Sequence, residues 1–128
     1  MYHRYLNISD MVGKVFTDII VDKEDRNIIF ICEEGMYKMF HDQDCCETVY
    51  IESIVGDIVD LTHNTILGAE EVITTGEETE DYYHSTHTFY KLKTKDGYVD
   101  IRWVGSSNGY YSERVNLIFM PFKQEDEE

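Results

Sequence analysis

The 128-residue sequence contains one proline, three cysteines and no apolar run long enough to cross a bilayer. Its first residues also lack the apolar segment followed by small residues that marks a secretory signal. The cysteine count is odd and two of the cysteines, Cys45 and Cys46, are adjacent, which makes a poor disulfide framework. These absences predict a reduced, cytoplasmic protein that does not span a membrane.

Positive charge is also scarce. Eleven Lys and Arg stand against 26 Asp and Glu, which gives a formal net charge of −15. Binding to nucleic acid and to anionic lipid depends on clusters of Lys and Arg, so we expect neither direct nucleic-acid binding nor membrane binding. Between Lys38 and Lys91 the sequence has no Lys or Arg and twelve acidic residues. One region of the molecule is therefore predicted to be strongly negative.

Two interpretations of this acidic region stay open. It is either a solvated surface that keeps a small protein soluble, or a face that docks onto a basic groove of another protein, with carboxylates in the place of phosphates. The second interpretation predicts a partner-binding face of nine acidic residues from the middle of the chain: Asp42, Asp44, Glu47, Glu70, Glu71, Glu77, Glu78, Glu80 and Asp81.

The hydrophobic pattern predicts a mainly β (α+β) fold: a single antiparallel β-sheet domain, strongly curved or sandwich-like, spanning residues 1–122 and followed by a disordered acidic tail, 123–128. Extended segments are predicted at 12–21, 28–32, 36–40, 48–51, 65–75, 89–93, 98–104 and 115–122. The Asp-Gly pair before Tyr98 is a strong hairpin signal. Residues 28–32 are so apolar that we expect a central strand covered on both faces.

A short helix is predicted at 53–61, where Ile54, Ile58 and Leu61 follow a helical period and Ser53 is a candidate N-cap. Residues 76–81 carry a run of charges typical of a solvated loop. Exposed edge strands in such a β domain are compatible with a homodimer.

The turn between two extended segments, 41–47, contains His, Asp, Gln, Cys and Glu in place of the Gly, Pro, Ser and Asn that ordinary turns use. A metal-binding protein or metal-dependent enzyme centred on His41 to Glu47 is one hypothesis, since these are ligand types, but the spacing matches neither a zinc nor a calcium motif. The weak metal candidates are His41, Asp42, Asp44, Cys45 and Cys46. We expect no cofactor.

The alternative is structural, with a cysteine packed in the core and the carboxylates capping backbone donors or pairing with Arg102 or Arg114. A cysteine nucleophile is disfavoured, because negative surroundings raise the pKa of a thiol. We therefore expect a protein that is not an enzyme.

A second polar and aromatic stretch follows the predicted hairpin. Aromatic area beside Asn, Ser and Gly is typical of a binding surface. The candidate ligand-binding residues, suited to a nucleotide-like signalling molecule held by an oligomer, are Arg102, Trp103, Asn108, Tyr110 and Tyr111. The alternative is an Asn-Gly turn with aromatics packed over the sheet.

Several segments together resemble a small uncharacterised family of phage and prophage proteins. They are Phe40 to Glu52 (F-H-D-Q-D-C-C-E-T-V-Y-I-E), Ile54 to Asp57 (I-V-G-D), Ala69 to Val72 (A-E-E-V) and Gly97 to Ser112, with its G-Y-V-D-I-R-W and S-N-G-Y-Y-S parts. The resemblance implies a setting in the bacterial host cytoplasm, where small acidic phage proteins antagonise host machinery. It favours an inhibitor of a bacterial defence or nucleic-acid-handling protein with a basic surface.

Overall fold

The computed structural model describes residues 5–75 and 84–122. They form two short 3-10 helices, η1 (Ile8–Met11) and η2 (Ile58–Leu61), and eight strands. The strands are β1 (Asp18–Asp22), β2 (Asn27–Ile31), β3 (Gly35–Phe40), β4 (Thr48–Val55), β5 (Gly68–Thr75), β6 (His84–Thr94), β7 (Gly97–Ser107) and β8 (Asn116–Pro121). The predicted charged loop at 76–81 and the predicted tail at 123–128 lie outside the described residues.

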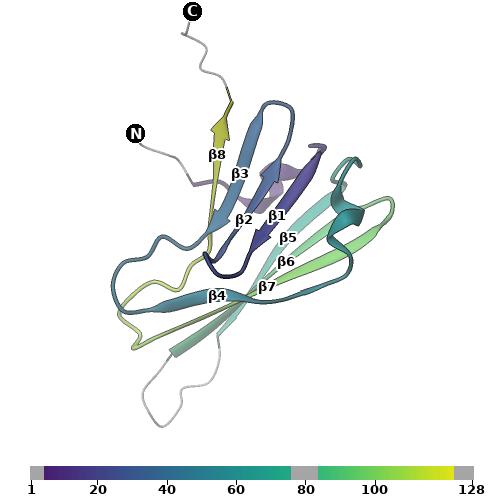
Figure 1. The fold of residues 1–128 in the computed structure, drawn as a ribbon. Coiled ribbons are helices and arrows are strands. Elements are labelled where there is room, and N and C mark those ends of the chain that lie inside the picture. Colours follow the sequence, from purple (N-terminus) through teal and green to yellow (C-terminus); the bar gives the residue numbers. More distant parts are fainter. Residues whose placement is uncertain (1–4, 76–83, 123–128) are drawn as a thin grey trace, which may run out of the picture.

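The strands make two four-stranded antiparallel sheets, ordered β1-β2-β3-β8 and β4-β7-β6-β5 (Figure 1). The first sheet begins as a local meander and is completed by β8, which returns from the far end of the chain to pair with β3. The second sheet is built on the β6–β7 hairpin, whose tight turn lies where the Asp-Gly signal predicts it. The prediction of a mainly β, sandwich-like domain is confirmed.

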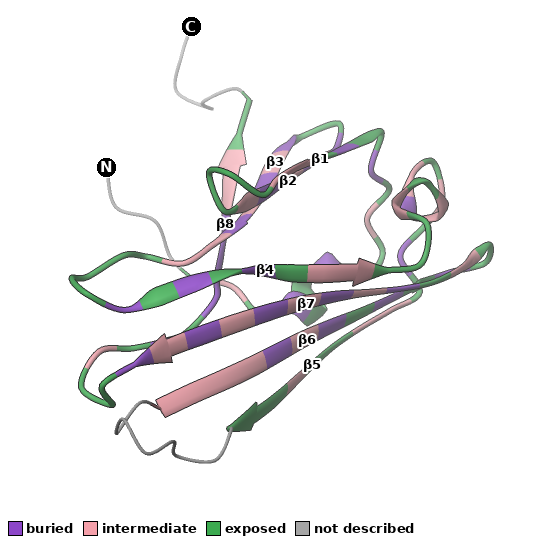
Figure 2. Cartoon of the chain, turned by 60° about the horizontal axis from the view of Figure 1, so that its bottom comes forward, coloured by how far each residue is buried: buried purple, intermediate pink, exposed green. Residues whose placement is uncertain are grey.

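The core lies between the two sheets and follows from the alternation of side chains along each strand. On β7, Val99, Ile101 and Trp103 point inward and are almost completely buried, while their neighbours are partly exposed (Figure 2). The indole Nε1 of Trp103 donates a hydrogen bond to Met39 Sδ at 3.3 Å, which joins β7 of one sheet to β3 of the other.

The prediction of a helix at 53–61 is wrong. Residues 53–55 continue β4 after a bulge between Ile51 and Ser53, and only Ile58–Leu61 turns, as η2. Gly56 separates the two with a φ of +107°, a conformation that a helix does not contain. The apolar positions that match a helical period are used instead by a strand residue facing the core and by a separate turn.

Candidate functional site

The polar turn between β3 and β4, residues 41–47, folds around the carboxylate of Glu47. This side chain is fully buried, and three donors converge on it: His41 Nε2 at 2.6 Å and the backbone N–H groups of Asp44 at 2.7 Å and Cys45 at 3.0 Å. The Gln43 side-chain amide also donates to the Glu47 carbonyl at 2.7 Å. The turn therefore needs no glycine or proline, because a buried anion organises its backbone.

His41 connects this turn to the segment that leads into β8. Its ring is 4% exposed, and Nδ1 donates to the backbone carbonyl of Arg114 at 2.6 Å while Nε2 donates to Glu47. Both ring nitrogens are therefore engaged within the protein. Burial raises the pKa of Glu47, but the hydrogen bonds from His41 and from the backbone of Asp44 and Cys45 outweigh it and lower that pKa to about 2.

The carboxylate of Glu47 caps backbone donors, as the structural alternative predicts, but the predicted pairing with Arg102 or Arg114 is replaced by contacts with other atoms. These atoms are those of the Arg114 carbonyl and of the Asn116 side chain, which accepts from the Asp42 N–H at 3.0 Å. No Arg guanidinium takes part in these contacts. Arg102 lies elsewhere, on the outer face of its sheet, with its guanidinium 5.5 Å from the centre of the Phe89 ring.

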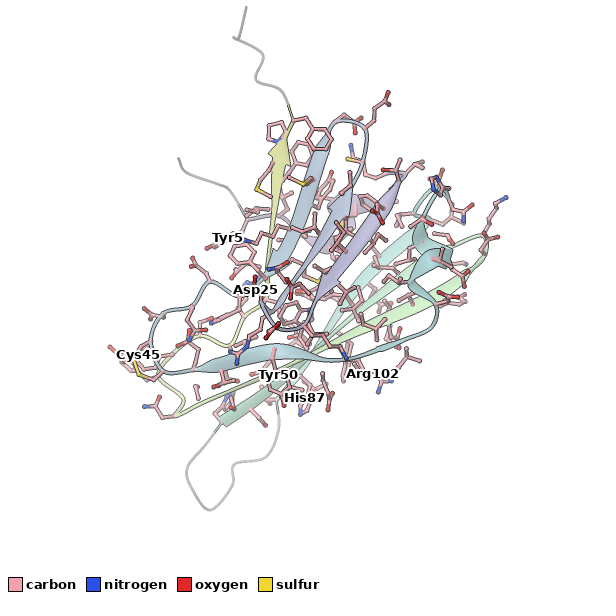
Figure 3. The ribbon with its side chains drawn as sticks, in the orientation of Figure 1. Tyr5, Asp25, Cys45, Tyr50, His87 and Arg102 are labelled. Carbon is pink, nitrogen blue, oxygen red and sulfur yellow. A yellow bond between two sulfur atoms is a disulfide. The ribbon has the colours of Figure 1, made fainter. Side chains whose placement is uncertain are left out.

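The candidate metal ligands do not converge. Both nitrogens of His41 are engaged within the protein, and in residues 5–75 and 84–122 no three His, Cys, Asp or Glu side chains are grouped to hold an ion. Cys45 and Cys46 are exposed at the tip of the turn, away from Arg102 (Figure 3), and are joined in a disulfide, with Cys32 as the free, buried cysteine. The expectation of a fully reduced chain is therefore corrected.

The proposed ligand-binding surface also needs correction. Trp103 is 1% exposed, whereas Tyr110 is 81% exposed in the loop after β7 and packs edge-on against Tyr111. Arg102 and Trp103 are neighbours on a strand, so they point to opposite faces of the sheet, and Trp103 lies in the core. The described structure does not bring Arg102, Trp103 and the Asn108 loop to one surface.

A second polar network, which the sequence analysis did not find, lies beneath this loop. Ser107 Oγ donates to Glu113 Oε2 at 2.5 Å, and His84 Nδ1 lies 3.2 Å from the same oxygen. The carboxylate stands between serine and histidine, so His84 is not placed as a base for the Ser107 hydroxyl, as nucleophilic catalysis requires. A Cβ at Gly105 would lie 2.7 Å from the Glu113 Cβ, so the glycine makes room for this contact.

Only a weak signal for this network exists in the sequence. Continuing the inward alternation of β7 from Trp103 through Gly105 places Ser107 facing the core, and a buried hydroxyl needs a partner. Nothing in the sequence identifies that partner as Glu113.

Two of the predicted acidic residues line an open pocket of about 340 Å³ beside the polar turn. We call it the loop pocket; its lining residues are Tyr5, Asp42, Gln43, Asp44, Ser112, Arg114 and Asn116. Asp42 Oδ2 accepts a hydrogen bond from the Tyr5 hydroxyl at 2.5 Å. Tyr5 and Arg114 also line a neighbouring hollow that contains Glu71, so acids from distant parts of the chain lie on either side of them.

The nine acidic residues of the predicted partner-binding face differ in burial and in their contacts. Glu47 is buried inside the turn. Glu71 is exposed and accepts from the Tyr90 hydroxyl at 2.8 Å, and burial followed by this bond raises the pKa of Tyr90. Glu70 faces Lys91 in the register of β5 and β6. The remaining predicted members, Glu77, Glu78, Glu80 and Asp81, lie outside the described residues.

The exposed carboxylates are not neutralised by ion pairs with Lys or Arg in the part of the chain that the structure describes. The two ion pairs there both join a histidine to a buried glutamate, His41 to Glu47 and His84 to Glu113. The exposed carboxylates of the described residues therefore keep their negative charge at the protein surface.

A family model described as a domain of unknown function (DUF7448) matches residues 9–117. Searches of curated proteins and of solved structures each gave no match. Within the described residues, no helix has the length and apolar character needed to cross a membrane.

Proposed function

The chain belongs to the DUF7448 family, a domain of unknown function, and we propose that it is a non-enzymatic binding protein whose acidic surface, centred on the loop pocket, occupies a basic site on another protein. The observation that carries the proposal is that the exposed carboxylates have no Lys or Arg ion-pair partner among the described residues. With a net charge of −15, such a surface attracts cationic surfaces and speeds their encounter.

The loop pocket supports this proposal by its composition and its rigidity. Asp42 and Asp44 supply two carboxylates against the single guanidinium of Arg114, so the pocket is suited to a Lys or Arg side chain of the partner. The turn that carries both aspartates is fixed by the buried carboxylate of Glu47. A surface that is ordered before binding loses less entropy when the partner docks.

The partner class follows from the same chemistry and from the resemblance to phage proteins. A protein groove that binds nucleic acid presents Lys and Arg at a spacing suited to phosphates. Exposed carboxylates can bind the same Lys and Arg side chains and so compete with nucleic acid for the groove. We therefore propose a nucleic-acid-handling or defence protein of a bacterial host as the target, with the chain acting as its inhibitor.

The test is capture from a bacterial lysate by the immobilised full chain at low and at high salt, read by mass spectrometry. The double variant Asp42→Asn, Asp44→Asn should lose the protein captured at low salt. The matched control is Glu24→Gln, Glu33→Gln, which removes the same number of charges from exposed positions on other turns. Equal loss of capture in both variants would mean that the net charge, and not the loop pocket, determines binding. Capture that resists high salt would contradict the electrostatic proposal.

A further inference from the structure

The outer face of the sheet β1-β2-β3-β8 is apolar, although it is turned away from the core. Ile28, Phe30, Tyr37 and Met39 are buried between the sheets, so the residues that alternate with them point outward. In register these include seven apolar residues. Ile20 is 48% exposed, Ile29, Ile31, Met36, Phe40 and Met120 are partly exposed, and Ile118 is buried.

This composition is unusual for an antiparallel sheet with one face exposed, which normally alternates apolar and polar residues. The outer face of the other sheet is mixed. Lys91, Asp100 and Arg102 share it with aromatic and aliphatic residues such as Tyr50, Phe89 and Val55. On β2, Ile29 and Ile31 point away from the other sheet and are partly exposed, although a strand that is apolar on both sides is typical of one covered on both sides.

The charges on this apolar face are few and follow a pattern. Lys38 lies near the middle of the sheet, with its ammonium group 4.9 Å from the centre of the Phe40 ring. Asp18 and Asp22 lie on the same face along the edge strand β1. The face therefore carries one cation near its centre and two carboxylates along one edge.

We infer that the apolar face is the interface between two copies of this chain. The surface is self-complementary, as a two-fold interface must be, because it carries both the central cation and the carboxylates that pair with it. A two-fold axis along the strands lays β3 of one copy over β2 of the other. Each Lys38 then lies over an isoleucine strand, away from the other Lys38, with a second copy's β1 carboxylates within reach.

The area of the face can be compared with that of an interface between two protein copies. Four strands about 4.8 Å apart and about six residues long cover about 20 Å by 20 Å, or about 400 Å² in projection. The largest apolar patches on monomeric proteins are about 300–600 Å² and are often functional. This is about half of the roughly 800 Å² per partner of a standard interface, so the turns at the rim have to add to the contact.

Salt separates this interface from the acidic binding surface. Two copies that each carry −15 repel one another, and this repulsion is screened as ionic strength rises, whereas apolar contact is not weakened. Dimerisation through the apolar face should therefore become tighter with salt, while capture of a basic partner should weaken. Either proposal can fail without the other.

The experiment is sedimentation velocity of the full chain over a concentration series at low and high salt. We expect a monomer–dimer equilibrium that shifts toward dimer with both concentration and salt. Ile20→Asp should shift it toward monomer. Val55→Asp should leave it unchanged, because Val55 is a matched residue, 49% exposed against 48% for Ile20, on the edge strand and outer face of the other sheet.

Lys38→Glu provides a second variant that leaves the apolar side chains intact and should also weaken the dimer, since it places a third carboxylate beside Asp18 and Asp22. Circular dichroism confirms that each variant is folded. A wild-type protein that stays monomeric throughout the series would overturn the inference. So would a dimer that survives Ile20→Asp and Lys38→Glu, or one that is lost in Val55→Asp.

Discussion

Replacing Met39 by Leu tests the hydrogen bond that crosses the core from Trp103. The two side chains have similar volumes, and such swaps usually cost less than about 1.5 kcal/mol. The change also removes the sulfur that accepts from the buried indole N–H, and an orphaned buried donor costs about 1–3 kcal/mol. Because sulfur is a weak acceptor, we expect the free energy of unfolding to fall by about 1–2 kcal/mol.

Urea unfolding measures this loss, and Trp103, the only tryptophan, reports it by fluorescence. With a slope of about 2 kcal/mol per M, the midpoint should fall by about 0.5–1 M. Met36→Leu, on the outer side of the same strand, is the control and should change the midpoint little.

A double-mutant cycle with Trp103→Phe, followed by circular dichroism, isolates the contact itself. If Met39→Leu is as costly with phenylalanine at position 103 as with tryptophan, the N–H to sulfur bond does not stabilise the fold. Equal effects of the Met36 and Met39 variants would also refute the reasoning.

Two further variants test the polar turn and the packing of the first sheet. The folded pKa of Glu47, about 2, lies below its usual 4.5, so its contribution to stability is complete above pH 4.5 and is lost as the pH falls toward 2. Thermal melts over this range should show a flatter decline for Glu47→Gln than for the wild type or for the exposed control Glu52→Gln; parallel curves would contradict the assignment. Gly35→Ala places a Cβ against the Met120 carbonyl oxygen, closer than real Cβ atoms come, and should destabilise by about 1–3 kcal/mol or more, because β3 and β8 have to separate. Gly68→Ala, whose Cβ would meet nothing closer than 3.8 Å, should be nearly neutral, and similar urea midpoints for the two glycine variants would refute this close approach.

Much of the fold was predictable because it rests on local patterns. Alternation from Val99 to Trp103 and the Asp-Gly signal before Tyr98 identify the central hairpin and its inward face. The same alternation places Arg102 and Trp103 on opposite faces of the sheet. The sequence alone was therefore enough to exclude a binding surface that contains both residues. The helix at 53–61 failed because three apolar positions fit a helical period and equally fit a strand followed by a turn.

The polar turn at 41–47 stands out in the sequence, but its role does not. That role depends on burial of Glu47 and on the Arg114 carbonyl, which comes from a part of the chain 73 residues from His41. Adjacent strands of one sheet bring these groups together, and no local pattern encodes that approach. The Ser107 and Glu113 contact is hidden for the same reason, since it depends on how the loop after β7 folds back.

The pairing of β3 with β8 has a consequence for how the chain is made. During synthesis, β1, β2 and β3 leave the ribosome long before β8, so the edge of β3 and the apolar side chains of this half-built sheet stay uncovered until β8 emerges. Final closure requires the ends of a long loop to meet, a step that is slow in β proteins rich in distant contacts. Nascent chains halted before Asn116 should therefore be more prone to aggregation and to capture by chaperones than the finished polypeptide.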